Sequence, residues 1–238
     1  MQLLHGDCLE LMKSIPDGSV DMVLCDLPYG ITSRNKWDNI IPLEELWQQY
    51  NRICKLNAAI ILFAQMPFGS ALIESNRKNF RYEWIWQKHQ GSGFLNANRM
   101  PLRAHENILV FYKKLPTYNP QKTKGKPYKA KSGVKTSTNY GSFDGSWHTD
   151  SDGERFPTDV LKYPAVRQFH PTQKPVELLE YLIKTYTNEG DIVLDNCMGS
   201  GSTCVAAINT NRHYIGFELD EGYFEIAKKR IAQKAVTV

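Results

Sequence analysis

The stretch Ile192-Val193-Leu194-Asp195-Asn196-Cys197-Met198-Gly199-Ser200-Gly201-Ser202-Thr203 decides the fold. Its apolar start predicts a short buried strand, and its glycines permit a tight turn into a helix. Residues 205–208 open that helix, and residues 214–217 predict the next strand. This order of strand, glycine turn, helix and strand predicts a parallel βαβ unit. Its turn lies at a helix N-terminus, where a ligand can bind.

The same alternation of strand and helix continues toward both ends of the chain. Before this unit, apolar runs and helical spacing predict strands at 21–25 and 58–64 around a helix at 43–56, with two more strands at 82–87 and 108–112. Amphipathic helices are predicted at 176–186 and 223–231. The pattern predicts an α/β fold, with a mostly parallel sheet covered by helices on both faces.

Composition narrows the class of protein. The chain has 238 residues, 42% of them hydrophobic, which excludes a disordered, collagen-like or disulfide-stapled chain. Its longest apolar run, 58–64, is far shorter than the roughly 20 residues that span a bilayer, and its start lacks signal-peptide features, so we expect a cytoplasmic protein. Five cysteines without a close pair indicate neither a disulfide framework nor a metal site.

Charge is distributed unevenly along the chain. The formal net charge is +4, but residues 113–143 hold eight lysines and no acidic residue, which leaves −4 on the rest. Prolines, glycines and scattered aromatic residues predict a loop-rich insert here. Such an insert suits phosphate neutralisation and base stacking, and a solvated flexible loop is the alternative that composition leaves open. The lysines are Lys113, Lys114, Lys122, Lys124, Lys126, Lys129, Lys131 and Lys135.

The glycine turn carries the features of a nucleotide site. Gly199 and Gly201 let the backbone approach a ligand closely, and Asp195 ends the preceding strand. Glu218 ends the next strand, where an acidic residue can accept hydrogen bonds from both ribose hydroxyls. The third glycine of the dinucleotide fingerprint is missing, which disfavours a dehydrogenase. We interpret the pattern as an adenosine site, against the alternative of an ordinary tight turn.

A second site is predicted at Asp26-Leu27-Pro28-Tyr29. Pro28 disfavours helical geometry at Leu27, so the Leu27 carbonyl and the Asp26 carboxylate form two adjacent acceptors, followed by an aromatic face. Two acceptors suit an exocyclic amino group, because hydrogen bonds from both N–H groups withdraw the nitrogen lone pair from the ring and prepare it to attack an electrophilic methyl group. The alternative is a strand-ending turn in which Asp26 bonds local backbone.

Two further segments are candidates for ligand contacts. In His170-Pro171-Thr172-Gln173-Lys174-Pro175, a first helical position at Pro175 would put Lys174 at the positive end of a helix dipole, which favours a bound anion such as a cofactor carboxylate; a solvent-facing lysine is the alternative. We expect His170 to be a structural hydrogen-bonding residue. Asp7 and Glu10 form a predicted capping box, and Asp7 can also contact a cofactor adenine. Asp220 is predicted to cap the last helix.

Together these motifs resemble the DNA amino-methyltransferases that use S-adenosylmethionine, in the permuted arrangement called the beta class. Asp26-Leu27-Pro28-Tyr29 resembles the catalytic D-P-P-Y of that family, and residues 195–201 resemble its D-x-F-x-G-x-G cofactor loop. The catalytic motif precedes the cofactor loop, with an insert between them. Leu27 replaces a proline of which only the carbonyl is used, and Cys197 replaces the usual phenylalanine.

The resemblance implies a Rossmann-like methyltransferase fold with a mixed, mostly parallel seven-stranded sheet, a circularly permuted motif order and an inserted target-recognition region. It implies a catalytic half at 1–112, a DNA target-recognition region at 113–168 that includes the eight lysines, and a cofactor-binding half at 169–238. The implied cofactor is S-adenosylmethionine. The residues implied to hold it are Asp7, Thr172, Lys174, Asp195, Cys197, Gly199, Gly201 and Glu218.

The resemblance also implies the reaction. A flipped adenine in double-stranded DNA would receive the methyl group on N6 by direct displacement, with Asp26, Leu27, Pro28 and Tyr29 as the catalytic residues and no cysteine nucleophile. In this family a leading aspartate goes mainly with N6-adenine and a serine with N4-cytosine. Trp37 either folds over the flipped base or packs on the surface.

Several alternatives stay open. They are N4-cytosine methylation, methylation of protein or RNA amides, and DNA binding by a degenerate methyltransferase fold; the intact Asp26, Tyr29, Asp195 and Glu218 argue against degeneracy. The implied partner is double-stranded DNA, without a membrane. A homodimer and a cognate restriction endonuclease are further partners that the resemblance allows.

Overall fold

The computed structural model describes residues 1–30, 39–132, 136–137, 141–142, 147–166, 168–169 and 172–235, and the strands between 131 and 149 by their backbone. The chain forms two compact units, one of Met1–Asn119 with Asp159–Val238 and one of Pro120–Thr158. None of the helices in the described residues is long and apolar enough to cross a membrane.

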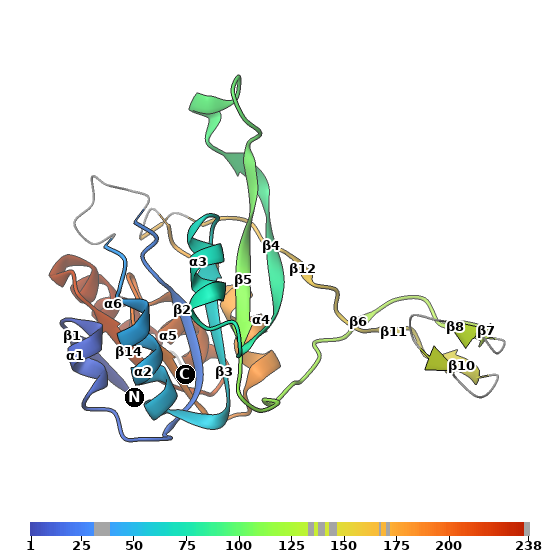
Figure 1. Ribbon diagram of the computed structural model, residues 1–238, viewed down its shortest axis with the longest axis horizontal. Helices are drawn as coiled ribbons and strands as arrows, with labels where there is room; N and C mark the ends of the chain where they lie inside the picture. The colour runs from blue at the N-terminus through green and yellow to red at the C-terminus, as the bar shows by residue number, and fades with distance from the viewer. Residues whose placement is uncertain are drawn as a thin grey trace. The chain divides into compact units, whose positions relative to one another are not determined.

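The larger unit is built on one eight-stranded sheet with the order β1-β14-β13-β2-β3-β5-β4-β12 (Figure 1). The paired strands run parallel except at β5, which is antiparallel to both β3 and β4. The bounds are β1 (Gln2–His5), β2 (Val20–Asp26), β3 (Cys54–Ala64), β4 (Phe80–Ser92), β5 (Arg103–Phe111), β12 (Val160–Lys162), β13 (Ile192–Asp195) and β14 (His213–Glu218). The eighth strand corrects the expected seven: β12 adds three residues parallel to β4 at the edge, too few for a sequence pattern to predict.

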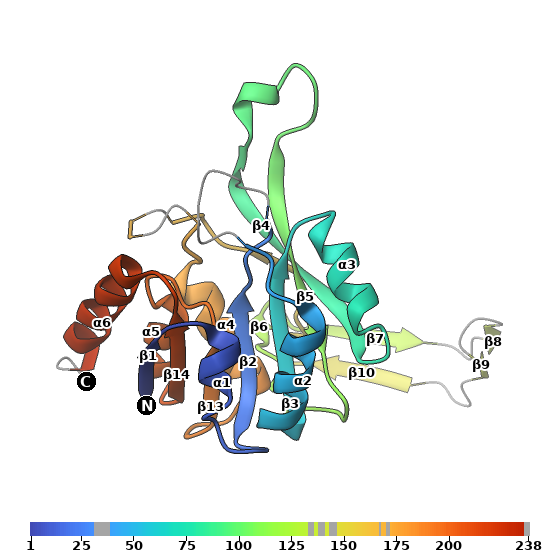
Figure 2. The same ribbon diagram turned by 60° about the vertical axis from the view of Figure 1, so that its left-hand side comes forward.

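Helices cover both faces of this sheet, as Figure 2 shows with α1, α2 and α3 on the near face and α4 behind. One buried cluster joins α1, α2 and α3 to one face, and a second joins α4 and α5 to the other. The bounds are α1 (Cys8–Met12), α2 (Leu43–Ile53), α3 (Phe68–Ser75), α4 (Val176–Tyr186), α5 (Ser202–Asn209) and α6 (Glu221–Ala235), with a 3₁₀ turn at Phe94–Asn96. The predicted alternation of strands and helices is confirmed.

The central strand β2 explains why the sheet is buried on both sides. Val23 and Cys25 pack into the cluster of α1–α3, whereas Met22 and Leu24 pack into the cluster of α4 and α5. A strand that is covered on both faces reads as an apolar run, because neither set of alternating side chains meets water. This burial fixes the position of Asp26, the last residue of the strand.

Several element boundaries differ from the predictions. The helix expected to reach residue 56 ends at Ile53, because Cys54 is already extended and pairs with Val20 of β2. Strands β4 and β5 continue past the apolar runs that predicted them into a long hairpin, in which Ser92 pairs with Arg103 (Figure 1). The hairpin end exposes Phe94 to solvent.

The smaller unit consists of short antiparallel strand pairs. They are β6 (Thr123–Lys124) with β11 (Glu154–Arg155), β7 (Tyr128–Ser132) with β10 (Trp147–Ser151), and β8 (Thr136–Ser137) with β9 (Gly141–Ser142). Of the expected recognition region 113–168, residues 113–119 and 159–168 belong to the larger unit. The recognition role of this region stays a prediction.

Candidate active site

A cavity of about 560 Å³ opens at the carboxyl ends of the parallel strands. Asp26, Asp195 and Glu218 are the last residues of β2, β13 and β14, and all three line it. Adjacent strands β13 and β2 lead in opposite directions, β13 through α5 to β14 and β2 through α2 to β3. The cavity therefore lies at the topological switch point, where α/β sheets bind their ligands.

The glycine turn after β13 is shaped by backbone hydrogen bonds. Asp195 accepts from the Cys197 amide through Oδ1 at 3.1 Å, and the Met198 amide donates to the Phe217 carbonyl at 2.8 Å. Gly201 has a φ of +78°, and a Cβ there would lie 3.1 Å from the Cβ of Ala227. Glycine is required at this position by both its backbone conformation and the close approach of α6.

The carboxylates around the turn are held by backbone amides. Glu218 accepts from the amides of Gly199 and Asp220, each at 2.8 Å, and is 8% exposed. Burial raises the pKa of Glu218, and burial raises the pKa of Asp195 to about 6. Within the described residues, no lysine or arginine forms an ion pair with either carboxylate. Among the described residues, this end of the cavity therefore presents carboxylates without a paired cation.

Asp7 lies at the same end and caps α1. Its Oδ1 accepts from the amides of Leu9 at 2.8 Å and Glu10 at 3.3 Å, and Asp7 also lines the cavity. The predicted capping box is only half formed, because the Glu10 side chain pairs with Lys13 at 2.7 Å rather than with the backbone of Asp7. The ion pair of Glu10 with Lys13, one turn later in the helix, competes with a hydrogen bond from the Asp7 amide to the Glu10 side chain.

Asp220 caps α6 as predicted, accepting from the Tyr223 amide at 3.0 Å.

At the other end of the cavity, the residues of the second motif lie together. Asp26, Leu27, Pro28 and Tyr29 all line the cavity, and the Tyr29 hydroxyl donates to Oδ1 of Asp26 at 2.6 Å. The Tyr29 ring packs beside Phe68 of α3, with centroids 5.3 Å apart. Burial, followed by the Asp26 charge, raises the pKa of Tyr29 well above its usual value. The phenol therefore stays protonated and acts as a donor.

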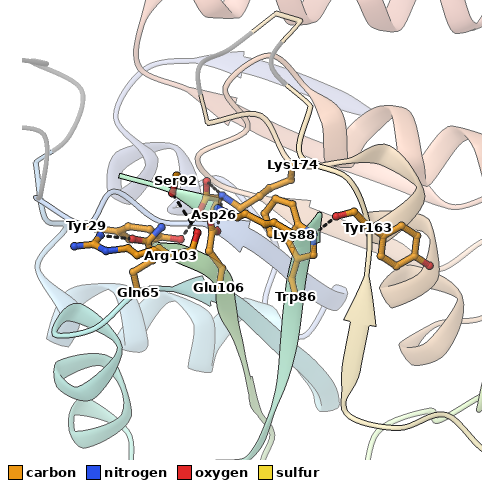
Figure 3. A network of polar contacts seen from close by, with 10 residues as sticks. All are labelled: Asp26, Tyr29, Gln65, Trp86, Lys88, Ser92, Arg103, Glu106, Tyr163 and Lys174. Atoms are coloured by element: carbon orange, nitrogen blue, oxygen red, sulfur yellow. Dashed lines mark hydrogen bonds and ion pairs between the residues drawn. The ribbon is translucent and has the colours of Figure 1, made fainter. Parts of the chain in front are cut away.

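Lys174 corrects the sequence-based expectation most clearly. Its side chain is 7% exposed, so it is not a solvent-facing lysine, and Nζ forms ion pairs with Oδ2 of Asp26 and, at 3.4 Å, with Oε2 of Glu106 (Figure 3). Pro175 is the N-cap rather than the first helical residue, and α4 begins at Val176. The anions beside Lys174 are the chain's own carboxylates, and a contact of Lys174 with the cofactor stays a prediction.

Glu106 and Lys88 are members of the site that the sequence patterns missed. Glu106 lies near the start of β5, and its Oε1 accepts from Nζ of Lys88 on the neighbouring β4. Burial alone would raise the pKa of Glu106, but Lys174 and Lys88 outweigh burial and lower it. A polar pair, Glu106-Asn107, directly before the apolar run of 108–111 was the available signal.

Other predicted contacts divide between the cavity and regions outside it. Thr172, Cys197 and Gly199 line the cavity, whereas Gly201 supports the turn from behind. The thiols are unsuited to nucleophilic attack, since burial raises the pKa of Cys25 to about 12. Trp37, His170 and Pro171 lie outside the described residues.

The insert lysines are distributed over both units. Lys113 and Lys114 belong to the larger unit. In the smaller unit, Lys122 pairs with Glu154 at 2.6 Å and Lys129 with Asp150 at 3.3 Å. Antiparallel pairing of the strands places these carboxylates beside the lysines. Residues 120–158 as a whole carry seven basic and four acidic side chains. Lys124 and Lys126 are exposed, while the Lys131 side chain and Lys135 lie outside the described part.

Comparisons of the sequence and the structure with known proteins find DNA methyltransferases. A family model described as DNA methylase matches residues 20–229. The type II methyltransferase M.BglII of Bacillus subtilis is 31% identical over 260 residues, which cover 95% of this chain and 67% of the relative. The solved M1.HpyAVI–SAM complex has a TM-score of 0.67 at 26% identity, with 97% of this chain and 98% of that chain covered.

A second solved structure, the PvuII DNA methyltransferase described as cytosine-N4-specific, has a TM-score of 0.70 at 16% identity, covering 98% of this chain and 90% of that chain. The expected Rossmann-like architecture is confirmed.

Proposed function

Because the chain belongs to the DNA methylase family, we propose that it transfers a methyl group from S-adenosylmethionine to the exocyclic N6 of an adenine in double-stranded DNA. The observation that carries this proposal is a single cavity with two different ends. One end presents uncompensated carboxylates around a glycine turn, and the other presents the Asp26 and Leu27 acceptors beside Tyr29.

The first end fits the cofactor. Glu218 and Asp7 offer acceptors for ribose hydroxyls and the adenine amino group, and the glycine turn allows close approach of the backbone. S-adenosylmethionine carries a sulfonium and an ammonium charge, which suit an anionic surface around Asp195. When bound, the cofactor supplies an electrophilic methyl group.

The second end fits an exocyclic amino group. The Asp26 carboxylate and the Leu27 carbonyl accept its two N–H bonds, which turns the nitrogen lone pair out of conjugation with the ring. Tyr29 stacks against the base and orients Asp26 through its 2.6 Å hydrogen bond. To reach this pocket the base must leave the duplex, at an unstacking cost of about a few kcal/mol that contacts to the DNA backbone offset.

Adenine is the preferred target because the motif begins with Asp26. The resemblance associates a leading aspartate with N6-adenine and a leading serine with N4-cytosine. Cytosine N4 is the second candidate, favoured by the fold shared with a cytosine-N4-specific enzyme. Both bases present an amino group to the same two acceptors, so the product nucleoside decides between them.

The test is incubation of the protein with duplex DNA and methyl-labelled S-adenosylmethionine, followed by nucleoside analysis of the DNA. We expect N6-methyladenine, and we expect Asp26→Ala to lower the rate at least about 100-fold, since it removes an acceptor used in the transition state. Asp21→Ala is the matched control, because Asp21 lies on the same strand and pairs with Lys55 away from the cavity. N4-methylcytosine would overturn the adenine assignment, and an unchanged rate in Asp26→Ala would overturn the mechanism.

The insert is tested by the salt dependence of DNA binding. Replacing the exposed Lys124 and Lys126 with alanine should reduce the slope of log K against log salt by about one per lost phosphate contact. The same replacement of Lys122 and Lys129 should change the slope less, since carboxylates already neutralise them. Equal, unchanged slopes in both double variants would contradict a DNA-binding role for these lysines.

A further inference from the structure

The carboxylate that should receive the target amino group is already engaged. Oδ1 of Asp26 accepts from the Tyr29 hydroxyl at 2.6 Å, and Oδ2 accepts from the ammonium of Lys174 (Figure 3). An ammonium on Asp26 weakens its attraction for a further donor. It also opposes the positive charge that develops on the amino nitrogen as the methyl group is transferred.

A second acceptor for this ammonium lies beside it. Oε2 of Glu106 is 3.4 Å from Nζ of Lys174, and both side chains are 7% exposed. Oε2 is also the one buried side-chain oxygen or nitrogen among the described residues that lacks a hydrogen-bond partner. Buried carboxylate oxygens nearly always accept a hydrogen bond, so one that only approaches the Lys174 ammonium, at 3.4 Å, requires an explanation.

Glu106 is itself held in place by a different cation. Lys88 binds Oε1 of Glu106 and packs its ammonium 4.9 Å from the centroid of the Trp86 ring. Trp86 in turn donates to the Tyr163 carbonyl at 2.9 Å. Glu106 lines the cavity, and its Oε2 therefore belongs to a braced carboxylate that lies within a small movement of the lysine.

We propose that Glu106 is a positioning residue that takes the ammonium of Lys174 away from Asp26 when the target amino group arrives. This inference rests on the proposed function. Asp26 is thereby freed to accept the amino group, while the two lysines and two carboxylates remain neutral as a set.

Lys174 changes partner as an ammonium, without proton transfer. Burial alone would lower the pKa of Lys174, but Asp26 and Glu106 outweigh burial and raise it, so the side chain stays an ammonium. Lys174 therefore does not act as the base that removes the proton of the methylated amino group. In the free protein Lys174 pairs with Asp26. In the complex it pairs with Glu106 instead.

The experiment compares Glu106→Gln, Lys174→Met and the double variant in single-turnover methylation of duplex DNA with saturating S-adenosylmethionine. In Glu106→Gln the lysine has no charged acceptor except Asp26, and we expect the rate to fall at least 10-fold. Removing Lys174 as well frees Asp26, so the double variant should be at least threefold faster than Glu106→Gln. Recovery of rate on losing a second charged residue is an effect that general structural damage does not produce.

The controls separate positioning from folding and binding. Glu83→Gln is the matched variant, since Glu83 is a neighbouring sheet carboxylate that hydrogen-bonds Asn107 and does not line the cavity. We expect it to methylate at the wild-type rate. Dissociation constants for S-adenosylmethionine and unfolding temperatures are measured for every variant, and the cofactor constant of Glu106→Gln should stay within twofold of wild type.

A double variant as slow as the product of the two single losses would overturn the inference, because Glu106 would then act independently of Lys174. If Glu106→Gln does not fold, Glu106→Asp tests the same competition, because it keeps the charge but draws the carboxylate back from Lys174. The rate should fall and should recover when Lys174→Met is added, and a wild-type rate in Glu106→Asp would overturn the inference. Failure of the proposed function is distinguishable, because the wild-type protein would then methylate no DNA.

Discussion

The two ends of the cavity hold their carboxylates in different ways. At the cofactor end, Asp195 and Glu218 are fixed by backbone amides and face no cation in the described structure. At the motif end, Asp26 and Glu106 are fixed by Lys174 and Lys88. Backbone amides orient a carboxylate but leave its charge, whereas lysines cancel it.

This difference matches the charge of what each end is proposed to bind. Uncompensated buried carboxylates cost stability in the free protein, which a cationic ligand restores when it binds. Burial raises the pKa of Asp195 for the same reason. A DNA base is neutral, and at the motif end the carboxylates of Asp26 and Glu106 are already paired with Lys174 and Lys88. One cavity can thus receive a cation and a neutral base side by side.

Among the tests of this comparison, the largest effect is expected from neutralising the cofactor end. Glu218→Gln removes a charged acceptor, and we expect the dissociation constant for S-adenosylmethionine to rise by about 10- to 100-fold, the loss of one charge-assisted hydrogen bond. Isothermal titration calorimetry measures it. Asp220→Asn is the control, since Asp220 caps α6 outside the cavity, and its constant should stay within twofold. Equal effects of the two variants would show that Glu218 contributes no more to cofactor binding than a carboxylate outside the cavity.

A smaller effect is expected in the stability of the free protein. The pKa of Asp195 is raised to about 6 by burial, so the folded state holds this proton more tightly than the unfolded chain. Stability from this group is therefore present at acidic pH and is lost as pH rises toward about 6.

Asp195→Asn should accordingly stabilise the free protein by about 1–2 kcal/mol at pH 7.5 and by nearly nothing at pH 4, while weakening cofactor binding. Urea unfolding at the two pH values measures the difference. Destabilisation of the variant at pH 7.5 would contradict an uncompensated charge at this position.

The smallest effect concerns the uncharged support of the glycine turn. Tyr50 is fully buried and donates to Oδ1 of Asn196 at 2.5 Å. Tyr50→Phe leaves that oxygen unpaired and should cost about 1 kcal/mol of unfolding free energy, with methylation at saturating cofactor unchanged. Tyr82→Phe should cost less, because Tyr82 is 37% exposed and water can replace its hydroxyl. A 10-fold loss of rate in Tyr50→Phe would mean that the turn depends on more than the carboxylates.

The sequence predicted the parts of the site that depend on strand ends. Asp26, Asp195 and Glu218 each follow a short apolar run, and parallel strands bring their carboxyl ends to one edge of the sheet. Both the order of elements and the placement of these residues therefore followed from local patterns.

The charge pairing across the cavity was beyond local patterns. Lys174 meets Asp26 across 148 residues of sequence, and which carboxylate a lysine pairs with depends on the packed fold. Glu106 was missed because β5 is antiparallel, so its start rather than its end lies at the cavity. In the smaller unit, the pairing of β6 with β11 likewise brought Glu154 to Lys122.

The strand order also has a consequence for how the molecule is made. Strand β1 pairs in register with β14, so that Gln2 lies opposite Ile215, and β2 is flanked by the early β3 and the late β13. Contacts so distant in sequence slow folding, since the intervening chain must be closed first. During synthesis β2 lacks its neighbour β13, and β1 lacks its partner β14, until residues 192–218 have been made, so both ends of the cavity are completed only by the last part of the chain.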